Sequence, residues 1–202
     1  MAVSPASLID RRFLFVEQKT KIFELRNQFK IKDETGQVIG AVEQVEQSPL
    51  AVLTRIFSDL DVELPVTLEV RGAQGEPQLR LHKPWFRLRM DVSDPATGAA
   101  LGSVVKRIRV GKARFAMIDA TGNDLGAIYA ENWRARDFRI EGASGVEVGR
   151  VTKKWEGIAK ALFTDADNYM IDLPETLTGP LRPLALAAAL VIDTIMKQKD
   201  YN

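Results

Sequence analysis

The sequence contains no cysteine and only one histidine, His82. Without cysteine the chain can form neither a disulfide nor a thiolate nucleophile. A structural zinc site takes four ligands, mostly cysteine and histidine, so His82 alone does not make a conventional one. The sequence also lacks a nucleophile elbow, a phosphate loop and a dinucleotide-binding glycine motif. We therefore predict a protein that is not an enzyme, with no resident cofactor, in which His82 has a structural or surface role.

An excess of charge of one sign is also missing. The chain has 28 Lys and Arg residues against 27 Asp and Glu residues, which gives a net charge of +1. Bulk electrostatics therefore predict neither a nucleic-acid partner nor a general attraction to anionic membranes. Residues 1–8 lack the basic and then apolar pattern of a secretory signal, and we expect a flexible N-terminus there. These absences favour a cytoplasmic protein that associates with a membrane at most peripherally.

The longest apolar run is too short to be a typical membrane span. From Leu181 to Met196 a helix would measure roughly 24 Å, whereas the hydrocarbon core of a bilayer is about 30 Å thick. The run has no polar stripe between Leu184 and Ile192, so it must be buried on all sides, in protein or in lipid. Its length, its alanines and Asp193 favour a helix inside a protein. A membrane insertion flanked by basic residues and an ordinary half-buried helix are the alternatives.

A hairpin pattern recurs along the chain. Each copy has alternating apolar residues, a turn rich in Asp, Thr, Ser and Gly, and a returning strand that contains a second glycine. In four copies the two glycines are four residues apart: Gly36 and Gly40, Gly98 and Gly102, Gly122 and Gly126, Gly145 and Gly149. The first glycine permits a positive φ in the turn, and the second marks a bulge or a close backbone approach. A fifth, imperfect copy runs from Val66 to Leu81.

These hairpins define the expected fold. Short strands with frequent turns are typical of a sandwich or a barrel. Further strand-like runs at residues 13–17 and 21–25 bring the total to ten or more, together with one wholly apolar helix. We predict a mainly β, single-domain chain (residues 1–202), a closed antiparallel barrel around a central helix at residues 181–197. A second helix is expected at residues 48–61, with Ser48 as its cap, as a lid, an outer wall or a lipid-touching segment.

Basic residues gather on three stretches of the chain, beside Arg107, after Trp133 and before Trp155. On a strand Arg107 and Arg109 share one face. If the stretches meet on one side of the barrel, paired cations can hold a lipid phosphate, with an aromatic ring such as Trp133 at the headgroup level. The candidate lipid-binding residues are Arg107, Arg109, Lys112, Arg114, Arg134 and Arg136. A solvated sheet face balanced by nearby acids, and a nucleic-acid site, are the alternatives.

The C-terminal third resembles the phospholipid scramblase family. The resemblance lies in residues 148–158 and 161–168 and in the apolar helix that ends in Val191-Ile192-Asp193. Residues 27–31 with Gly36-Gln37 resemble the first hairpin of that family, and residues 66–70 with Lys83-Pro84 resemble the second. The resemblance covers residues 8–196 and is most specific from Gly149 to Asn168. The family is similar to the plant LURP-one-related proteins and to the tubby C-terminal domain.

The resemblance implies a twelve-stranded barrel around a central C-terminal helix and an association with membrane phospholipid. The sequence departs from the animal members in three ways. It shows no proline-rich N-terminal extension, it has no cysteine cluster for palmitoylation, and its calcium loop is degraded. These departures make it look like a bacterial-type core domain.

The resemblance also implies a calcium loop at residues 165–176. The candidate metal ligands are Asp165, Asp167, Asn168 and Asp172. Calcium takes six to eight oxygen ligands on a tightly turned loop. Met170 stands where the loop glycine would be, and Thr176 stands at the closing position, so we expect weak calcium binding at best. The alternative is a polar turn whose side chains bond their own backbone.

Two functions follow from the sequence. The first is a non-catalytic barrel that binds anionic phospholipid headgroups and at most assists phospholipid translocation. The second is a cytoplasmic scaffold or small-ligand-binding protein without lipid activity. No motif identifies a protein partner.

Overall fold

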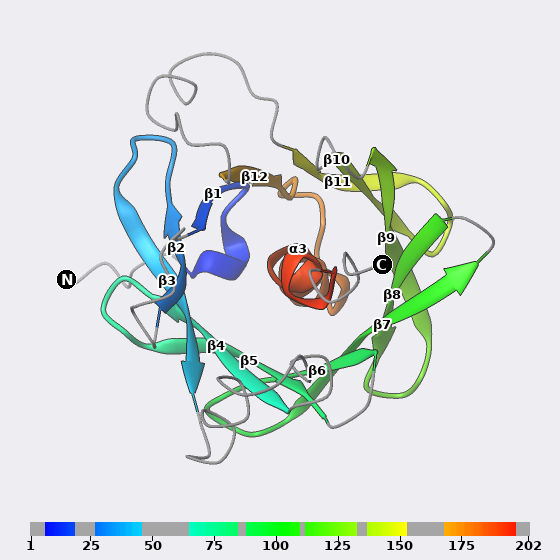
Figure 1. The fold of residues 1–202 in the computed structure, drawn as a ribbon, viewed down its shortest axis with the longest axis horizontal. Coiled ribbons are helices and arrows are strands. Elements are labelled where there is room, and N and C mark those ends of the chain that lie inside the picture. Colours follow the sequence, from blue (N-terminus) through cyan, green and yellow to red (C-terminus); the bar gives the residue numbers. More distant parts are fainter. Residues whose placement is uncertain are drawn as a thin grey trace, which may run out of the picture.

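The structure is a computed structural model that describes residues 7–18, 27–45, 65–84, 88–109, 112–132, 137–152 and 168–196. Its strands form one closed antiparallel barrel around helix α3 (Leu181–Met196), which confirms the predicted mainly β barrel with a central helix (Figure 1). The strands are β1 (Phe13–Gln18), β2 (Asn27–Lys32), β3 (Val38–Val45), β4 (Val66–Gly72), β5 (Pro77–Lys83), β6 (Arg89–Ser93), β7 (Ala100–Arg109), β8 (Lys112–Asp119), β9 (Asp124–Asn132), β10 (Asp137–Gly142), β11 (Glu147–Thr152) and β12 (Tyr169–Asp172).

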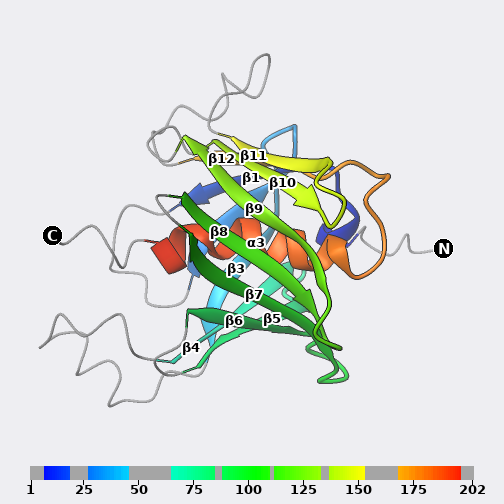
Figure 2. The same ribbon diagram turned by 90° about the vertical axis from the view of Figure 1, so that its right-hand side faces the viewer.

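The strands follow one another around the wall in chain order. Each strand pairs antiparallel with its neighbours, and β1 closes the ring by pairing with both β2 and β12. Among the described strands, closure leaves no unpaired sheet edge. The helix runs along the inside of this wall, as the side view shows (Figure 2).

Helix α3 is buried because it is apolar on every side. Its residues from Leu184 to Val191 are each at most 1% exposed. Ala185 and the alanines at 187–189 let the wall come close, and the helix packs mainly against β7, β8 and β9. Each fully buried leucine contributes roughly 1.5–3 kcal/mol relative to an exposed one. Of the alternatives for this segment, burial in protein is therefore correct.

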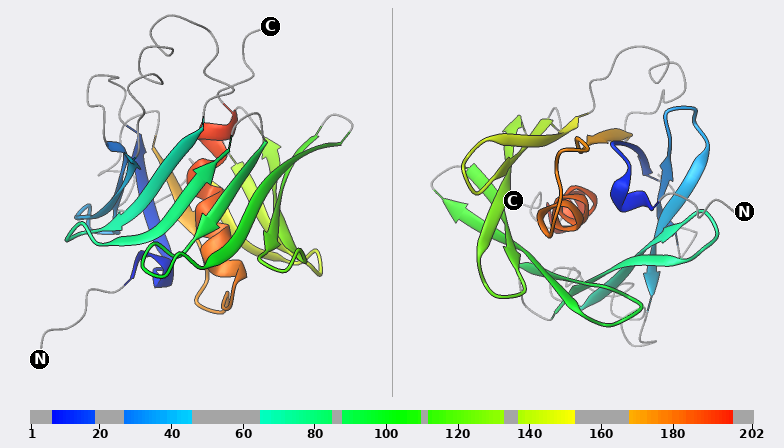
Figure 3. Two further views of the ribbon diagram at one scale, coloured as in Figure 1. Left: turned by 90° about the horizontal axis from the view of Figure 1, so that it is seen from below. Right: turned by 180° about the vertical axis from the view of Figure 1, so that it is seen from behind.

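One end of the barrel is closed where α3 begins. The short 3₁₀ helix η1 (Leu8–Asp10) lies there beside the start of α3 (Figure 3). The buried guanidinium group of Arg182 donates hydrogen bonds to the backbone carbonyls of Ile9, Arg11, Pro174 and Leu177. This one side chain therefore joins the N-terminal segment, the loop before α3 and α3 itself.

The N-terminal segment differs from its prediction at its end. The sequence predicts a flexible segment up to residue 8, but Ser7 bonds Gln78 and Leu8 is 2% exposed in the core. Leu8 is held because it packs against Gly40, where a Cβ would lie 2.6 Å from Leu8 Cδ1. The predicted helix at residues 48–61 and the predicted strand at residues 21–25 lie outside the described residues.

The second glycine of each hairpin marks a close backbone approach, as the sequence predicts. At Gly126 φ is +153°, and an added Cβ would lie 2.1 Å from the backbone oxygen of Glu141. At Gly40, Gly102 and Gly149 a Cβ would likewise meet a backbone oxygen within 2.8 Å. The pairing register also shifts in each of the five hairpins. These irregularities decide which outward side chains become neighbours across the wall.

Candidate functional site

A row of long side chains crosses the outer wall from β7 to β11. Successive register pairs join Arg107 to Arg114, Arg114 to Tyr129, Tyr129 to Arg139, and Arg139 to Arg150. We call these five residues the arginine row. Because each pair is directly opposite across neighbouring strands, the row places four guanidinium groups and one phenol ring on a single face.

The arginine row faces outward because its strands alternate. Phe115 and Ile128, which neighbour Arg114 and Tyr129 in the chain, point into the core and are at most 1% exposed. The next outward positions, Ala116 and Ala127, are small and also at most 1% exposed. Small residues under the row let long side chains lie flat along the sheet.

Tyr129 lies between two cations of the row. The Cζ atom of Arg114 is 5.7 Å from the centre of the Tyr129 ring, and that of Arg139 is 6.0 Å away. Both distances are within the range of a cation–π contact. The ring therefore helps to hold two positive groups near one another.

Arg107 and Arg114 converge on one carboxylate oxygen. The Oδ2 atom of Asp124 lies 3.4 Å from Nη1 of Arg107 and 3.2 Å from Nη2 of Arg114. Arg107 is 48% exposed, Arg114 31% and Asp124 39%. Two positive charges share one negative charge at this point, which lies at the surface.

The opposite end of the row is held much more tightly. Glu147 accepts two hydrogen bonds from Arg150, both 2.9 Å long, and Asp137 accepts a third from it at 3.0 Å. These contacts raise the pKa of Arg150 and lower that of Glu147. Between the two ends, Arg139 is 2.7 Å from the carboxylate of Glu141. The nearby acids expected for a solvated sheet face are therefore present.

The structure brings together part of the predicted basic site. Arg107 and Arg114 lie side by side in the row. Arg109 and Lys112 are paired in register at the end of the β7–β8 hairpin, where only their backbone is described. Arg134 and Arg136 lie outside the described residues, as does Trp133.

Three members of the row were not predicted as site residues. Tyr129 and Arg150 are assigned no role by the sequence, and Arg139 belongs to a basic stretch without being a predicted ligand. The hairpin pattern contains only part of the signal: a turn between Gly142 and Gly145 brings β10 and β11 together, and a register shift then places Arg139 opposite Arg150.

The predicted calcium ligands do not come together where they are described. Asn168 and Asp172 are separated by four residues of extended chain, or about 13 Å. The carboxylate of Asp172 instead contacts Arg12 at 3.2 Å. The described residues hold no group of three or more His, Cys, Asp or Glu side chains placed to bind a metal ion. Asp165 and Asp167 lie outside the described residues, so the weak calcium site stays a prediction.

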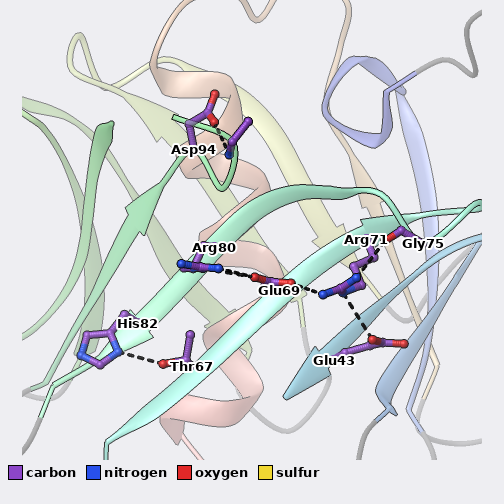
Figure 4. Close-up of polar contacts among 9 residues, drawn as sticks. Glu43, Thr67, Glu69, Arg71, Gly75, Arg80, His82 and Asp94 are labelled. Atoms are coloured by element: carbon purple, nitrogen blue, oxygen red, sulfur yellow. Dashed lines mark hydrogen bonds and ion pairs between the residues drawn. The ribbon is translucent and has the colours of Figure 1, made fainter. Parts of the chain in front are cut away.

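A second polar cluster lies on the outer face of β3, β4 and β5 (Figure 4). The carboxylate of Glu69, 4% exposed, contacts Arg71 and accepts hydrogen bonds from Nε and Nη2 of Arg80 at 3.1 and 2.7 Å. Arg71 also reaches Glu43 at 3.4 Å. Beside this cluster, Nδ1 of His82 is 3.0 Å from the hydroxyl of Thr67, in agreement with the structural or surface role predicted for His82.

A cavity of about 330 Å³ opens at the closed end of the barrel. It is lined by Ile9 and Asp10, by the loop before α3, and by Arg182 and Pro183. The volume is within the range of small-molecule sites.

Comparison with known proteins identifies the family. A family model described as Scramblase matches residues 4–197. The chain belongs to the scramblase family. It is 24% identical over 196 residues to phospholipid scramblase 1 of Rattus norvegicus, which covers 89% of this chain and 56% of that protein. It is 23% identical over 189 residues to a phospholipid scramblase family protein of Schizosaccharomyces pombe, covering 86% and 49% respectively. The chain thus spans about half the length of these relatives.

A solved structure shares the architecture of this scramblase-family chain. The crystal structure of a protein from Arabidopsis thaliana matches with a TM-score of 0.52 and 14% identity, over 90% of both chains. This likeness shows the fold. Family membership supports a lipid-related role at the level of the family.

Proteins of the scramblase family are in general not enzymes in the bond-making sense. The absence of catalysis in this chain stays a prediction. Among the described residues, α3 included, there is no helix long and apolar enough to cross a bilayer. The cytoplasmic or peripheral location likewise stays a prediction.

Proposed function

We propose that the arginine row binds the phosphate groups of anionic phospholipids at a membrane surface. The observation that carries this proposal is the convergence of Arg107 and Arg114 on one exposed carboxylate oxygen. Guanidinium groups bind phosphate by paired, charge-assisted hydrogen bonds. Tyr129 adds an amphipathic ring of the kind that is enriched at the headgroup level of membranes.

The proposal is headgroup binding, and translocation is at most an auxiliary role. A lipid that crosses a bilayer needs a polar path through apolar surroundings. The one segment of the chain that is apolar all round, α3, is enclosed by the barrel wall. The arginine row lies outside that wall, where it can meet a headgroup without a change of fold.

Vesicle flotation tests this proposal. The wild-type protein is mixed with vesicles of phosphatidylcholine alone, or of phosphatidylcholine and phosphatidylserine in equal parts, each with and without calcium. We expect flotation only with phosphatidylserine. The double variant Arg107→Glu, Arg114→Glu is expected to bind at least about thirtyfold more weakly, because each cation near an anionic surface contributes about 1 kcal/mol.

A matched control changes the same number of charges on the opposite side of the barrel. Strand β2 lies across the barrel from β8 and β9 (Figure 1). The double variant Lys30→Glu, Lys32→Glu on β2 has the same net charge as the row variant and is expected to keep most of the binding. Equal losses in the two variants would show non-specific attraction and would remove the proposed role of the row. A gain of binding on adding calcium would support the weak calcium site that the sequence predicts.

The cavity at the closed end favours a second candidate function. A space of about 330 Å³ beside Arg182 can take a small ligand. If the protein does not float with any of the vesicles, with or without calcium, the small-ligand function takes precedence. Crystal soaking with a fragment library then shows whether density appears in this cavity.

A further inference from the structure

We propose that Asp124 is a built-in competitor for the phosphate group that the arginine row binds. Its carboxylate takes the place between Arg107 and Arg114 where a phosphate oxygen would otherwise lie. This inference rests on the proposed function, and it names the residue that sets the affinity of that site.

The position of Asp124 is fixed by the backbone. Its Oδ1 atom accepts a hydrogen bond from the backbone amide of Gly126 at 3.2 Å. This leaves Oδ2 for the two arginines, at 3.4 and 3.2 Å. The carboxylate is thus presented to the arginines by the start of β9, as a single oxygen between two donors.

The contacts at Asp124 are long for bonds between charged groups. Such bonds usually measure about 2.7–2.9 Å, and Arg150 reaches that range with Glu147 in the same row. In addition, Nε of Arg114 is buried and has no hydrogen-bond partner among the described residues. Asp124 therefore satisfies Arg114 only in part, whereas a phosphate offers several oxygens to the same two guanidinium groups.

The path of the Arg114 side chain shows how exchange would occur. Asp124 is paired with Ile118, four residues beyond Arg114 along β8. Arg114 must therefore extend along the sheet, over the small and buried Ala116 and Ala127, to reach Asp124. Once Asp124 no longer binds it, the guanidinium group is able to turn outward to a phosphate, while the backbone of Arg114 stays paired in register with Tyr129.

Removing the charge of Asp124 should tighten phosphate binding. Asp124→Asn keeps the side-chain oxygen that accepts from Gly126 and removes the negative charge. We expect affinity to rise about fivefold, the factor that one unit charge at about 4 Å in water represents. The control is Glu34→Gln, which makes the same change of net charge on the exposed β2–β3 turn.

The experiment measures the wild type, Asp124→Asn and Glu34→Gln against two probes. One probe is vesicles of phosphatidylcholine and phosphatidylserine in equal parts, titrated by flotation. The other is inorganic phosphate, titrated by NMR of the arginine side chains. Tighter binding of Asp124→Asn to the vesicles supports competition for a lipid phosphate. Tighter binding of that variant to inorganic phosphate alone supports competition for a soluble phosphate and overturns the lipid function.

The failure of the inference is distinct from the failure of the proposed function. If the wild type binds vesicles through Arg107 and Arg114 but Asp124→Asn binds no more tightly, the function stands and the competition is overturned. Equal gains in Asp124→Asn and Glu34→Gln also overturn it, because net charge would then explain both. If neither the wild type nor Asp124→Asn binds either probe, both proposals are overturned.

Discussion

Two clusters on the outer wall each join two arginines to one carboxylate, but they differ in burial and in contact distance. At Glu69 two arginines meet one carboxylate that is 4% exposed, and Arg80 contacts it at 2.7 Å. At Asp124 two arginines also meet one carboxylate, but it is 39% exposed and the contacts are 3.2 and 3.4 Å. Burial and distance, rather than composition, therefore separate a cluster that supports the fold from one that is open to a ligand.

The difference originates in strand register. Glu69 and Arg80 are directly opposite each other on β4 and β5, so their side chains meet at short range. Asp124 is opposite Ile118, four residues along β8 from Arg114, so the arginine has to reach along the sheet. The carboxylate with a directly opposite arginine is 4% exposed, whereas the one reached along the sheet is 39% exposed.

The largest expected effect is on stability at Glu69. Glu69→Ala removes the shared carboxylate and leaves Arg71 and Arg80 near each other without it. Both arginines keep contact with water, being 30% and 42% exposed, so the loss falls below that of a fully buried pair. We expect the free energy of unfolding to fall by about 2 kcal/mol, and Tm to fall by about 4–8 °C. A Tm within one degree of the wild type would contradict a structural role for this cluster.

A smaller effect on stability is expected when Arg80 is replaced by lysine, because the two cations differ in shape. Arg80 donates from two nitrogens to the same oxygen of Glu69, which a lysine cannot do. Arg80→Lys should therefore lower the free energy of unfolding by about 1 kcal/mol. Arg114→Lys, at the exposed cluster, should leave it unchanged. Urea unfolding of both variants measures the contrast, and equal losses would show that the two clusters do not differ.

The fold could be predicted from the sequence because its signals are local. Alternating apolar residues and paired glycines define each hairpin, and the helix at residues 181–196 is apolar on every side from Leu184 to Ile192. The burial of Glu69 could not be predicted in this way. Alternation on β4 places it outward, where a carboxylate is normally solvated, yet its arginine partners and its surroundings leave it 3% exposed.

The site could be predicted only in part for the same reason. The sequence shows that Arg107 and Arg114 are close in the chain, and a hairpin brings them together. It does not show that Tyr129, Arg139 and Arg150 continue the row, because the register shift in each hairpin moves the partners by a residue. Nor does the sequence show that Asp124 contacts the arginines, because Asp124 is not directly opposite either of them across the strands.

A still smaller effect on stability is expected at Asp124 itself. Exposed ion pairs contribute about 0–1 kcal/mol, so Asp124→Asn should change the free energy of unfolding by less than about 0.5 kcal/mol. The same variant is expected to change phosphate affinity. Urea unfolding and vesicle titration of the same protein sample test whether the variant changes phosphate affinity without changing stability. A loss as large as that at Glu69 would mean that the Asp124 cluster is structural too.

Asp119 provides the finest test, because hydrogen bonds are the main influence on the pKa of this surface carboxylate. Its carboxylate accepts hydrogen bonds from the side chain of Asn123, from the hydroxyl of Thr121 and from both backbone amides. Mainly through the Asn123 and Thr121 side chains, these bonds lower the pKa of Asp119 from 3.8 to about 2. Since the folded pKa lies below the unfolded one, this carboxylate stabilises the fold fully above pH 3.8, and the contribution disappears as the pH falls towards 2. NMR titration should show the low pKa in the wild type and a value closer to 3.8 in the double variant Thr121→Ala, Asn123→Ala. If both proteins titrate near 3.8, the turn does not hold the charged form, and surface carboxylates of this barrel respond to ion pairing alone.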